Sequence, residues 1–196
     1  MSVVRFGRLA AALAFTAVLV GCAHPISMNA ETAPERVESK LIPKKVAYAL
    51  SDTERGKQVI TPGGGGDRVS YYPYRDLEKS IRDALRAVYQ DVVVVKSATD
   101  AEAVKASGAA LVFTPVIKTD SSSPSPFTWP PTIFKTEIAC TITDASGVEV
   151  TRVNAVGNGV AEFSEFKGNF GLSANRAATD VTTKLAQEIR RNEKLH

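Results

Sequence analysis

The stretch Phe134–Val156, FKTEIACTITDASGVEVTRVNAV, decides the fold class. In its first half apolar residues alternate with polar ones, which predicts a strand with one buried face. Those apolar positions are Phe134, Ile138, Cys140 and Ile142. Asp144–Gly147 (DASG) predicts a turn, and Val148–Val156 predicts the returning strand of an antiparallel hairpin.

The sequence beyond this hairpin predicts one more short strand and a closing helix. Gly157 and Gly159 predict a break in the sheet, after which 160–163 is expected to resume it. A helix is predicted over 174–191, because apolar residues recur there at helical spacing, with Ser173 as its N-cap.

The sequence before the hairpin predicts strands that alternate with helices. Strands are expected at 45–50, 92–95 and 109–119, and the helix between the first two at 72–89. Thr99–Glu102 has a capping-box pattern and is expected to open a short helix that Gly108 ends, whereas Pro115 favours an edge or a bulge. The order β-α-β-α-β-β-β-α predicts an α+β fold: a mixed, mainly antiparallel sheet with helices packed mostly on one side.

The N-terminus has the pattern of a secretory signal. Arg5 and Arg8 precede Leu9–Val20, an apolar run of 12 residues, which is shorter than the ~20 residues that span a bilayer. Leu19–Cys22 (LVGC) resembles the lipobox of bacterial lipoproteins. That resemblance implies cleavage before Cys22, lipidation of its thiol and, with Ala23 next, export to the outer membrane.

Three segments follow from this interpretation. Residues 1–21 are expected to be a lipoprotein signal peptide, 22–42 a lipidated cysteine with a polar tether, and 43–196 a single periplasmic α+β domain. Contact with the membrane is expected through the N-terminal lipid anchor.

Composition excludes several classes of function. Hydrophobic residues make up 44% and charged residues 23%, typical of a soluble domain. Loss of Arg5 and Arg8 would lower the formal charge of +3 by two, to +1, so nothing indicates nucleic-acid binding. The two histidines, His24 and His196, lie near the ends of the mature chain, which argues against a histidine-based catalytic or metal site; we expect no metal and no cofactor.

The tetraglycine in Thr61–Asp67 (TPGGGGD) invites a comparison with phosphate-binding loops. A Walker A loop needs lysine after its last glycine, but Asp67 follows Gly66, and its carboxylate would repel a phosphate. We therefore expect a flexible loop whose amides exchange quickly.

Two aromatic groups are candidates for partner binding. Tyr71, Tyr72 and Tyr74 could anchor a partner, although the favoured interpretation is that they join the start of the helix to the sheet. Phe127 and Trp129 lie in the proline-rich segment 121–131, which could dock an envelope protein, touch lipid headgroups, or fold back so that Trp129 covers the core.

No enzyme mechanism can be assembled from the sequence. Cys140 lies on the apolar face of its strand and is expected to be buried. Glu162 and Glu165 carry no sign of a tuned pair, and no Gly-x-Ser-x-Gly motif is present. We expect a protein that is not an enzyme.

The whole pattern resembles the YajG-like family of small proteobacterial lipoproteins. The resemblance is best over 109–191, where ITDASGVEVTRVNAVGNGVAEF leads into SANRAATDVTTKLAQEI. More distantly the element order is similar to the periplasmic domains of the penicillin-binding-protein activator and of curli- and Pel-type secretion lipoproteins. These relatives bind envelope proteins or form rings, and none is catalytic through this domain.

The resemblance implies an outer-membrane lipoprotein, facing the periplasm, that binds or helps assemble an envelope protein complex. Both a different envelope protein and self-association remain open as partners. The alternative is a ligand-binding lipoprotein that recognises lipopolysaccharide, peptidoglycan or a small anion.

Overall fold

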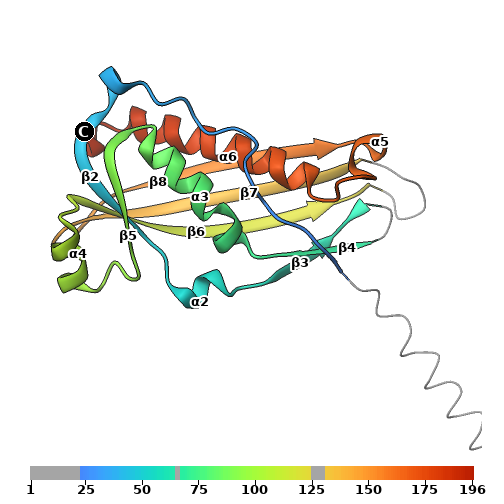
Figure 1. The fold of residues 1–196 in the computed structure, drawn as a ribbon, viewed down its shortest axis with the longest axis horizontal. Helices are drawn as coiled ribbons and strands as arrows, with labels where there is room; N and C mark the ends of the chain where they lie inside the picture. The colour runs from blue at the N-terminus through green and yellow to red at the C-terminus, as the bar shows by residue number, and fades with distance from the viewer. Residues whose placement is uncertain (1–22, 65–66, 125–130) are drawn as a thin grey trace, which may run out of the picture.

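The computed structural model describes residues 23–64, 67–124 and 131–196 (Figure 1). The strands are β1 (His24–Pro25), β2 (Ile42–Ala49), β3 (Val59–Pro62), β4 (Arg68–Tyr71), β5 (Tyr89–Val95), β6 (Leu111–Ser122), β7 (Thr132–Asp144) and β8 (Glu149–Ala161). The helices are α2 (Asp52–Arg55), α3 (Pro73–Arg86), α4 (Ala101–Ser107), α5 (Phe163–Phe166) and α6 (Leu172–Arg191), with 3₁₀ turns η2 (Glu38–Lys40) and η4 (Glu193–Leu195).

The main sheet has five strands in the order β5-β2-β6-β7-β8. β2 runs parallel to both β5 and β6, whereas β6, β7 and β8 pair antiparallel. This mixed sheet confirms the predicted α+β class. The predicted hairpin is also present: the Asp144 carboxylate accepts hydrogen bonds from the amides of Ser146 (2.8 Å) and Val148 (3.0 Å), and Gly147 has a positive φ of 86°.

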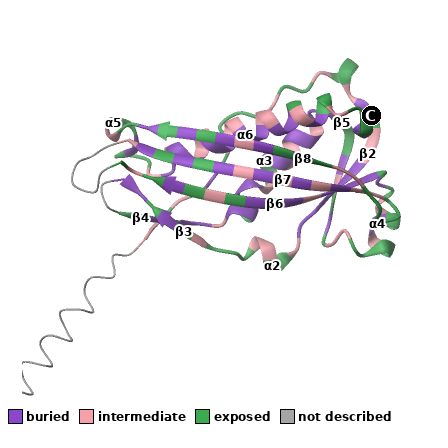
Figure 2. Ribbon diagram, turned by 180° about the vertical axis from the view of Figure 1, so that it is seen from behind, coloured by how far each residue is buried: buried purple, intermediate pink, exposed green. Residues whose placement is uncertain are grey.

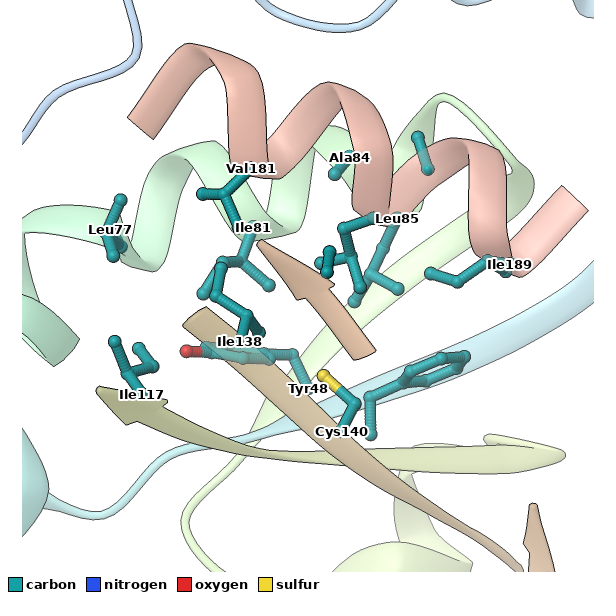
Figure 3. Close-up of a cluster of buried hydrophobic side chains, with 14 of the residues drawn as sticks. Tyr48, Leu77, Ile81, Ala84, Leu85, Ile117, Ile138, Cys140, Val181 and Ile189 are labelled. Carbon is teal, nitrogen blue, oxygen red and sulfur yellow. The ribbon is translucent and has the colours of Figure 1, made fainter. Parts of the chain in front are cut away.

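Helices α3 and α6 pack side by side on one face of the main sheet and enclose the larger core (Figure 3). Leu77, Ile81 and Leu85 of α3 meet Val181 and Ile189 of α6 above the strands. The short helix α4 covers part of the opposite face, where Val104 packs on a second, smaller cluster. The helices therefore lie mostly on one side, as the sequence predicts.

Gly157 and Gly159 do not interrupt the sheet, so the predicted break is wrong. β8 runs through both residues, and a methyl group added at either would lie within 3 Å of α6 backbone atoms. The glycines leave room for α6, whose backbone comes closest to them at Ser173, Ala177 and Val181. They permit close packing of helix on strand rather than a turn.

Several predicted boundaries shift for local reasons. α3 ends at Arg86 because Tyr89 already belongs to β5. Asp100 rather than Thr99 caps α4, since its carboxylate accepts from the Ala103 amide at 3.0 Å. Ser173 is not the N-cap of α6 but a buried residue inside its first turn, after Gly171.

Pro115 lies in an inner strand, at a point where one side of that strand is free of its neighbour. The pairing of β2 with β6 ends at Phe113, and beyond it the Ile117 amide donates to the Tyr74 hydroxyl at 3.2 Å. Because amides two residues apart point the same way, the missing N–H of Pro115 costs no ladder hydrogen bond.

A second sheet, which the sequence does not predict, forms in the order β1-β4-β3. Gly63 and Gly64 of the tetraglycine follow β3 in its hairpin with β4, and the Gly63 amide donates to the Asp67 carbonyl at 2.7 Å. Gly63 and Gly64 are buried, and a Cβ on Gly64 would lie 2.5 Å from the Phe166 ring. The expected flexible loop is therefore wrong for these two glycines; Gly65 and Gly66 lie outside the described residues.

Residues 26–37, which we call the strap, were expected to belong to a polar tether but pack along the groove between α3 and α6. Met28 is fully buried in the larger core. Successive strap amides donate to the two helices in turn, with a spacing of four residues on each. Met28 and Ala30 bond to Asp76 (3.4 Å) and Ser80 (3.3 Å) of α3, whereas Asn29 and Glu31 bond to Asn175 (2.9 Å) and Thr179 (2.8 Å) of α6.

The far end of the strap is held by two arginines. The Arg36 guanidinium donates to the Tyr89 carbonyl at 3.2 Å, and Arg190 of α6 donates to the Glu35 carbonyl at 2.7 Å. The expectation of a free tether over 22–42 is thus wrong for its described part. Within the described ranges, no helix has the length and apolar character needed to cross a membrane.

Candidate functional site

Cys140 and Glu165, two of the reactive side chains considered in the sequence, have structural roles in the described part of the chain. Burial raises the pKa of the Cys140 thiol to about 12, as expected of a cysteine inside the core. Glu165 accepts hydrogen bonds from Arg176 and from the Glu162 amide, and these bonds lower its pKa to about 2. In the ranges 23–64, 67–124 and 131–196, no three His, Cys, Asp or Glu side chains come together as metal ligands would.

The three tyrosines have separate structural roles. Tyr71 is fully buried, and its hydroxyl donates to Thr119 at 3.0 Å. Tyr74 is 7% exposed and accepts from the Ile117 amide. Neither side chain can contact a partner without leaving the core. The hypothesis that Tyr71 and Tyr74 bind a partner is therefore wrong for this structure. Tyr72 is half-buried, with the Arg75 guanidinium 4.0 Å above its ring.

The remaining predicted site residues, Cys22, Phe127 and Trp129, lie outside the described residues. Pro124 and Pro131 are the described residues that flank the segment with Phe127 and Trp129.

α3 and α6 leave uncovered the opposite face of β6, β7 and β8 (Figure 2). We call it the outer face. It consists of Val116, Lys118, Asp120, Ile133, Lys135, Glu137, Ala139, Thr141, Arg152, Asn154, Val156, Asn158 and Val160, all exposed or half-buried. Three of its apolar side chains are unusually open: Val116 is 50%, Val160 46% and Ile133 39% exposed.

A shallow hollow lies at the middle of the outer face. The register places Ala139 of β7 between Val116 of β6 and Asn154 of β8. Because alanine has the shortest side chain of the three, the surface dips there, and the hollow encloses about 400 Å³. Lys118 and Arg152 form parts of its rim. A single partner side chain could insert at this point.

The charges of the outer face alternate along the sheet. Lys118 lies opposite Glu137, and Asp120 lies opposite Lys135 on the neighbouring strand. Arg152 is paired with Glu149 at 2.8 Å. The face therefore carries no concentrated positive charge of the kind that binds phosphate groups.

The free edge of β8 is blocked by side chains from α6. Asp180 accepts from the Asn158 amide at 3.0 Å, while Arg176 and Lys184 donate to the carbonyls of Val160 (2.6 Å) and Val156 (3.1 Å). The three α6 residues are four positions apart, so they form one row along the strand. Because strand addition needs free backbone groups at an exposed edge, this row makes the β8 edge between Val156 and Val160 unsuitable for it.

Sequence reasoning did not identify the outer face as a site. The alternation in β7 marks Lys135, Glu137 and Thr141 as the polar side of a half-buried strand, which is typical of ordinary solvated positions. One feature of the sequence could have identified it: valines stand at positions that point to solvent, as Val116 and Val160 do.

Comparison with known proteins shows that the fold also occurs in a bacterial protein of solved structure. No protein-family model matches the sequence, and no curated protein matches it either. Protein XCC0632 from Xanthomonas campestris, assigned to DUF330, is similar in structure with a TM-score of 0.55 at 11% identity, over 86% of this chain and 96% of that one. This similarity shows a shared fold.

Two further structures resemble the chain less closely. A minor lipoprotein from Acinetobacter baumannii has a TM-score of 0.47 at 12% identity, over 76% of this chain and 94% of that one. Lipoprotein B from Nitrosomonas europaea, described as uncharacterized, has a TM-score of 0.40 at 11% identity, over 78% of this chain and 83% of that one.

Proposed function

We propose that the protein is a lipoprotein, anchored through Cys22 in the outer membrane, whose periplasmic domain binds an envelope protein without catalysis of its own. The observation that carries the binding proposal is the outer face, a three-stranded surface left uncovered while α3, α6 and the strap close the opposite side. The lipobox-like Leu19–Cys22 carries the anchoring proposal.

The size of the outer face favours a protein over a small molecule. The outer face covers nine residues each of β7 and β8, 133–141 and 152–160. At ~3.3 Å per residue and ~4.8 Å between strands, three strands of that length present roughly 430 Å². That area is about half of the ~800 Å² that one partner contributes to a standard protein interface, and so suits a small interface. Small ligands instead occupy pockets that enclose most of their surface.

The shape of the hollow also favours a protein partner. Protein interfaces centre on a few side chains that fit into pockets and are surrounded by polar contacts. Here the dip over Ala139 is bounded by Val116 and by the charged side chains of Lys118 and Arg152. An apolar side chain of the partner would fill the dip. The alternating charges around the dip would favour a partner surface of complementary charge.

In-cell photocrosslinking tests this proposal. A photoreactive amino acid replaces Val116 in one strain and Val148, a 62% exposed valine outside the outer face, in a matched control. We expect Val116 to yield a discrete adduct with another envelope protein, and Val148 to yield none. Placing the same amino acid at Trp129 tests the segment 121–131 as a second contact.

Each result at position 116 has a definite meaning. An adduct of twice the chain's own mass identifies the partner as a second copy. An adduct that carries lipopolysaccharide or peptidoglycan supports the ligand-binding alternative and contradicts a protein partner. The same adducts at positions 116 and 148 contradict the outer face as a specific site.

The anchor is tested separately with Cys22→Ser. We expect the variant to leave the membrane fraction or to remain uncleaved, because the acyl chains that hold the protein would be lost. A variant that stays membrane-bound at the mature size contradicts the anchor and leaves the outer face to be judged on the crosslinks alone.

A further inference from the structure

The chain enters the domain at a rigid point. His24–Pro25 pairs parallel with Val69–Ser70 of β4, and the Ile26 amide donates to the Ser70 carbonyl at 2.9 Å. The His24 ring stacks on Phe170 with centroids 4.6 Å apart and planes 3° from parallel. Its Nε2 atom lies 3.4 Å from the Asp67 carboxylate. The backbone of His24 is therefore fixed to the second sheet, and its ring is fixed to the segment between α5 and α6.

The elements around this entry form one end of the molecule, which we call the α5 end: Asp67, Arg68, α5 and residues 167–170. Figure 1 shows α5 and the tip of β4 at this end, with α4 and the C-terminus at the opposite end. The contact of Gly64 with Phe166 joins the β3–β4 turn to α5. The α5 end is thus a continuous surface beside the entering chain.

Two cations on this surface are available to a partner. Arg68 and Lys167 are exposed. Within the described residues, neither forms an ion pair. By contrast, the carboxylate of Glu165 is already paired with Arg176 at 2.7 Å.

The strap removes the slack that a tether would provide. Residues 28–31 are hydrogen-bonded to α3 and α6 at every amide, and Met28 is buried between those helices. As a result only Ala23 separates Cys22 from the fixed residue His24. Two fully extended residues span at most ~7 Å.

We propose that the α5 end rests on the lipid headgroups of the membrane, with Arg68 and Lys167 directed at lipid phosphates. This inference rests on the proposed anchor at Cys22. The polar layer on one side of a bilayer is roughly 5–8 Å thick, so a link of this length holds His24 within or against it. A free tether of about twenty residues would impose no such orientation.

The orientation has a consequence for the outer face. Strands β6, β7 and β8 run between the α5 end and the opposite end of the molecule. With the α5 end on the membrane, a 13-residue strand reaches ~43 Å into the periplasm. The hollow over Ala139, near the middle of β7, then lies about half that distance from the membrane and faces sideways, where another envelope protein can reach it.

Fluorescence quenching in vesicles tests the orientation. The lipidated full-length protein is reconstituted into vesicles of phosphatidylethanolamine and phosphatidylglycerol that contain a headgroup-attached quencher. One fluorophore is placed on Asn169→Cys, an exposed residue of the α5 end, and on Val148→Cys at the opposite end as the matched control. Cys140 is buried, and Cys22 is blocked by its lipid, so the introduced thiol is labelled selectively.

We expect several-fold stronger quenching at position 169 than at position 148. Inserting about ten glycine and serine residues between Ala23 and His24 restores the slack, and is expected to reduce the quenching at 169 to nearly that at 148. Arg68→Glu together with Lys167→Glu, with the fluorophore still on Asn169→Cys, is expected to reduce quenching in part, since the anchor remains.

The outcomes separate the two proposals. Equal quenching at 169 and 148 in protein that floats with the vesicles overturns the orientation but not the anchor. Strong quenching at 169 that survives the insertion overturns the short link as the cause of the orientation. Protein that does not float with vesicles overturns the anchor, and the orientation with it.

Discussion

The two faces of the β6–β7–β8 sheet come from the same strands but differ in which substitutions they tolerate. On the inner face, Gly157 and Gly159 admit the backbone of α6, and Phe134 and Ile138 are almost fully buried. On the outer face, Val116 and Ile133 remain open to solvent. The comparison shows that the alternation of side chains along each strand assigns residues to one face or the other. Which of those residues cannot be substituted is determined by α6, which packs on the inner face.

The largest difference is expected at Gly159. A valine there would place atoms within 3 Å of the Ser173 carbonyl and the Ala177 amide nitrogen, and backbone atoms cannot rotate away. We expect Gly159→Val to lower the free energy of unfolding by about 4 kcal/mol, through forced separation of α6 from β8. Urea denaturation measures this loss.

The neighbouring residue provides the control. Asn158 points to the outer face and bonds α6 only through its backbone amide. Asn158→Val is expected to change the free energy of unfolding by less than about 0.5 kcal/mol. If Gly159→Val proves as stable as wild type, the close approach of α6 to β8 is refuted.

The next difference compares two isoleucines of β7. Ile138 has no exposed surface, whereas Ile133 is 39% exposed on the outer face. Ile138→Ala is expected to cost about 3 kcal/mol, because it leaves a cavity under α3 and α6. Ile133→Ala removes the same atoms and is expected to cost under about 1 kcal/mol. Equal losses in thermal or urea unfolding would mean that the outer face is covered in solution.

A smaller effect is expected from the ion pair that helps to hold α6 beside β8. Hydrogen bonds from Arg176 lower the pKa of Glu165 to about 2, from an unperturbed 4.5. A carboxylate with a lowered folded-state pKa stabilises the fold above its unfolded pKa, and this stabilisation disappears as the pH falls through the folded pKa. The contribution is therefore complete above about pH 4.5 and is lost between 4.5 and 2.

Glu165→Gln tests this window. We expect the variant to be slightly less stable than wild type at pH 7, and the difference in melting temperature to shrink steadily below pH 4.5. The effect is small because both side chains are more than a third exposed. A difference that stays constant from pH 7 to pH 2 would show that the charge of Glu165 is not involved.

The smallest effect on stability is expected at Val116, which should nevertheless matter for binding. Val116→Lys puts a charge beside the hollow, where the side chain is already half exposed, so the free energy of unfolding should change by less than about 0.5 kcal/mol. The partner adduct at a neighbouring outer-face position, Asn154, should be lost, while Val148→Lys leaves it intact. Loss in both variants would contradict a specific role for the outer face.

Much of the fold could be predicted because its signals are local. The alternation in β7, the DASG turn and the apolar stripe of α6 each lie within one short segment, and each has a simple period. The second sheet was missed because β3 and β4 are only four residues long and enclose a glycine-rich turn. Such a turn is equally typical of a flexible loop.

The strap was missed for a different reason. Residues 26–37 have no period, and their amides are satisfied by side chains from two helices far away in the sequence, such as Asp76 and Asn175. Ser80 and Thr179 are unremarkable polar residues on helix surfaces until an extended segment lies between them. A polar segment without a pattern is therefore not necessarily a tether.

By itself the sequence determined the strands of the main sheet, the helices α3, α4 and α6, the hairpin and the lipobox-like N-terminus, because backbone preference and hydrophobic period act over a few neighbouring residues. Only the tertiary structure decided that Gly157 and Gly159 admit a helix, that Tyr71 and Tyr74 are buried, that the strap is fixed and that the outer face stays open. These properties depend on which segments, distant in the sequence, come into contact. That contact decides which side chains are buried and how much space each has, and it forms only when the sheet and helices pack together.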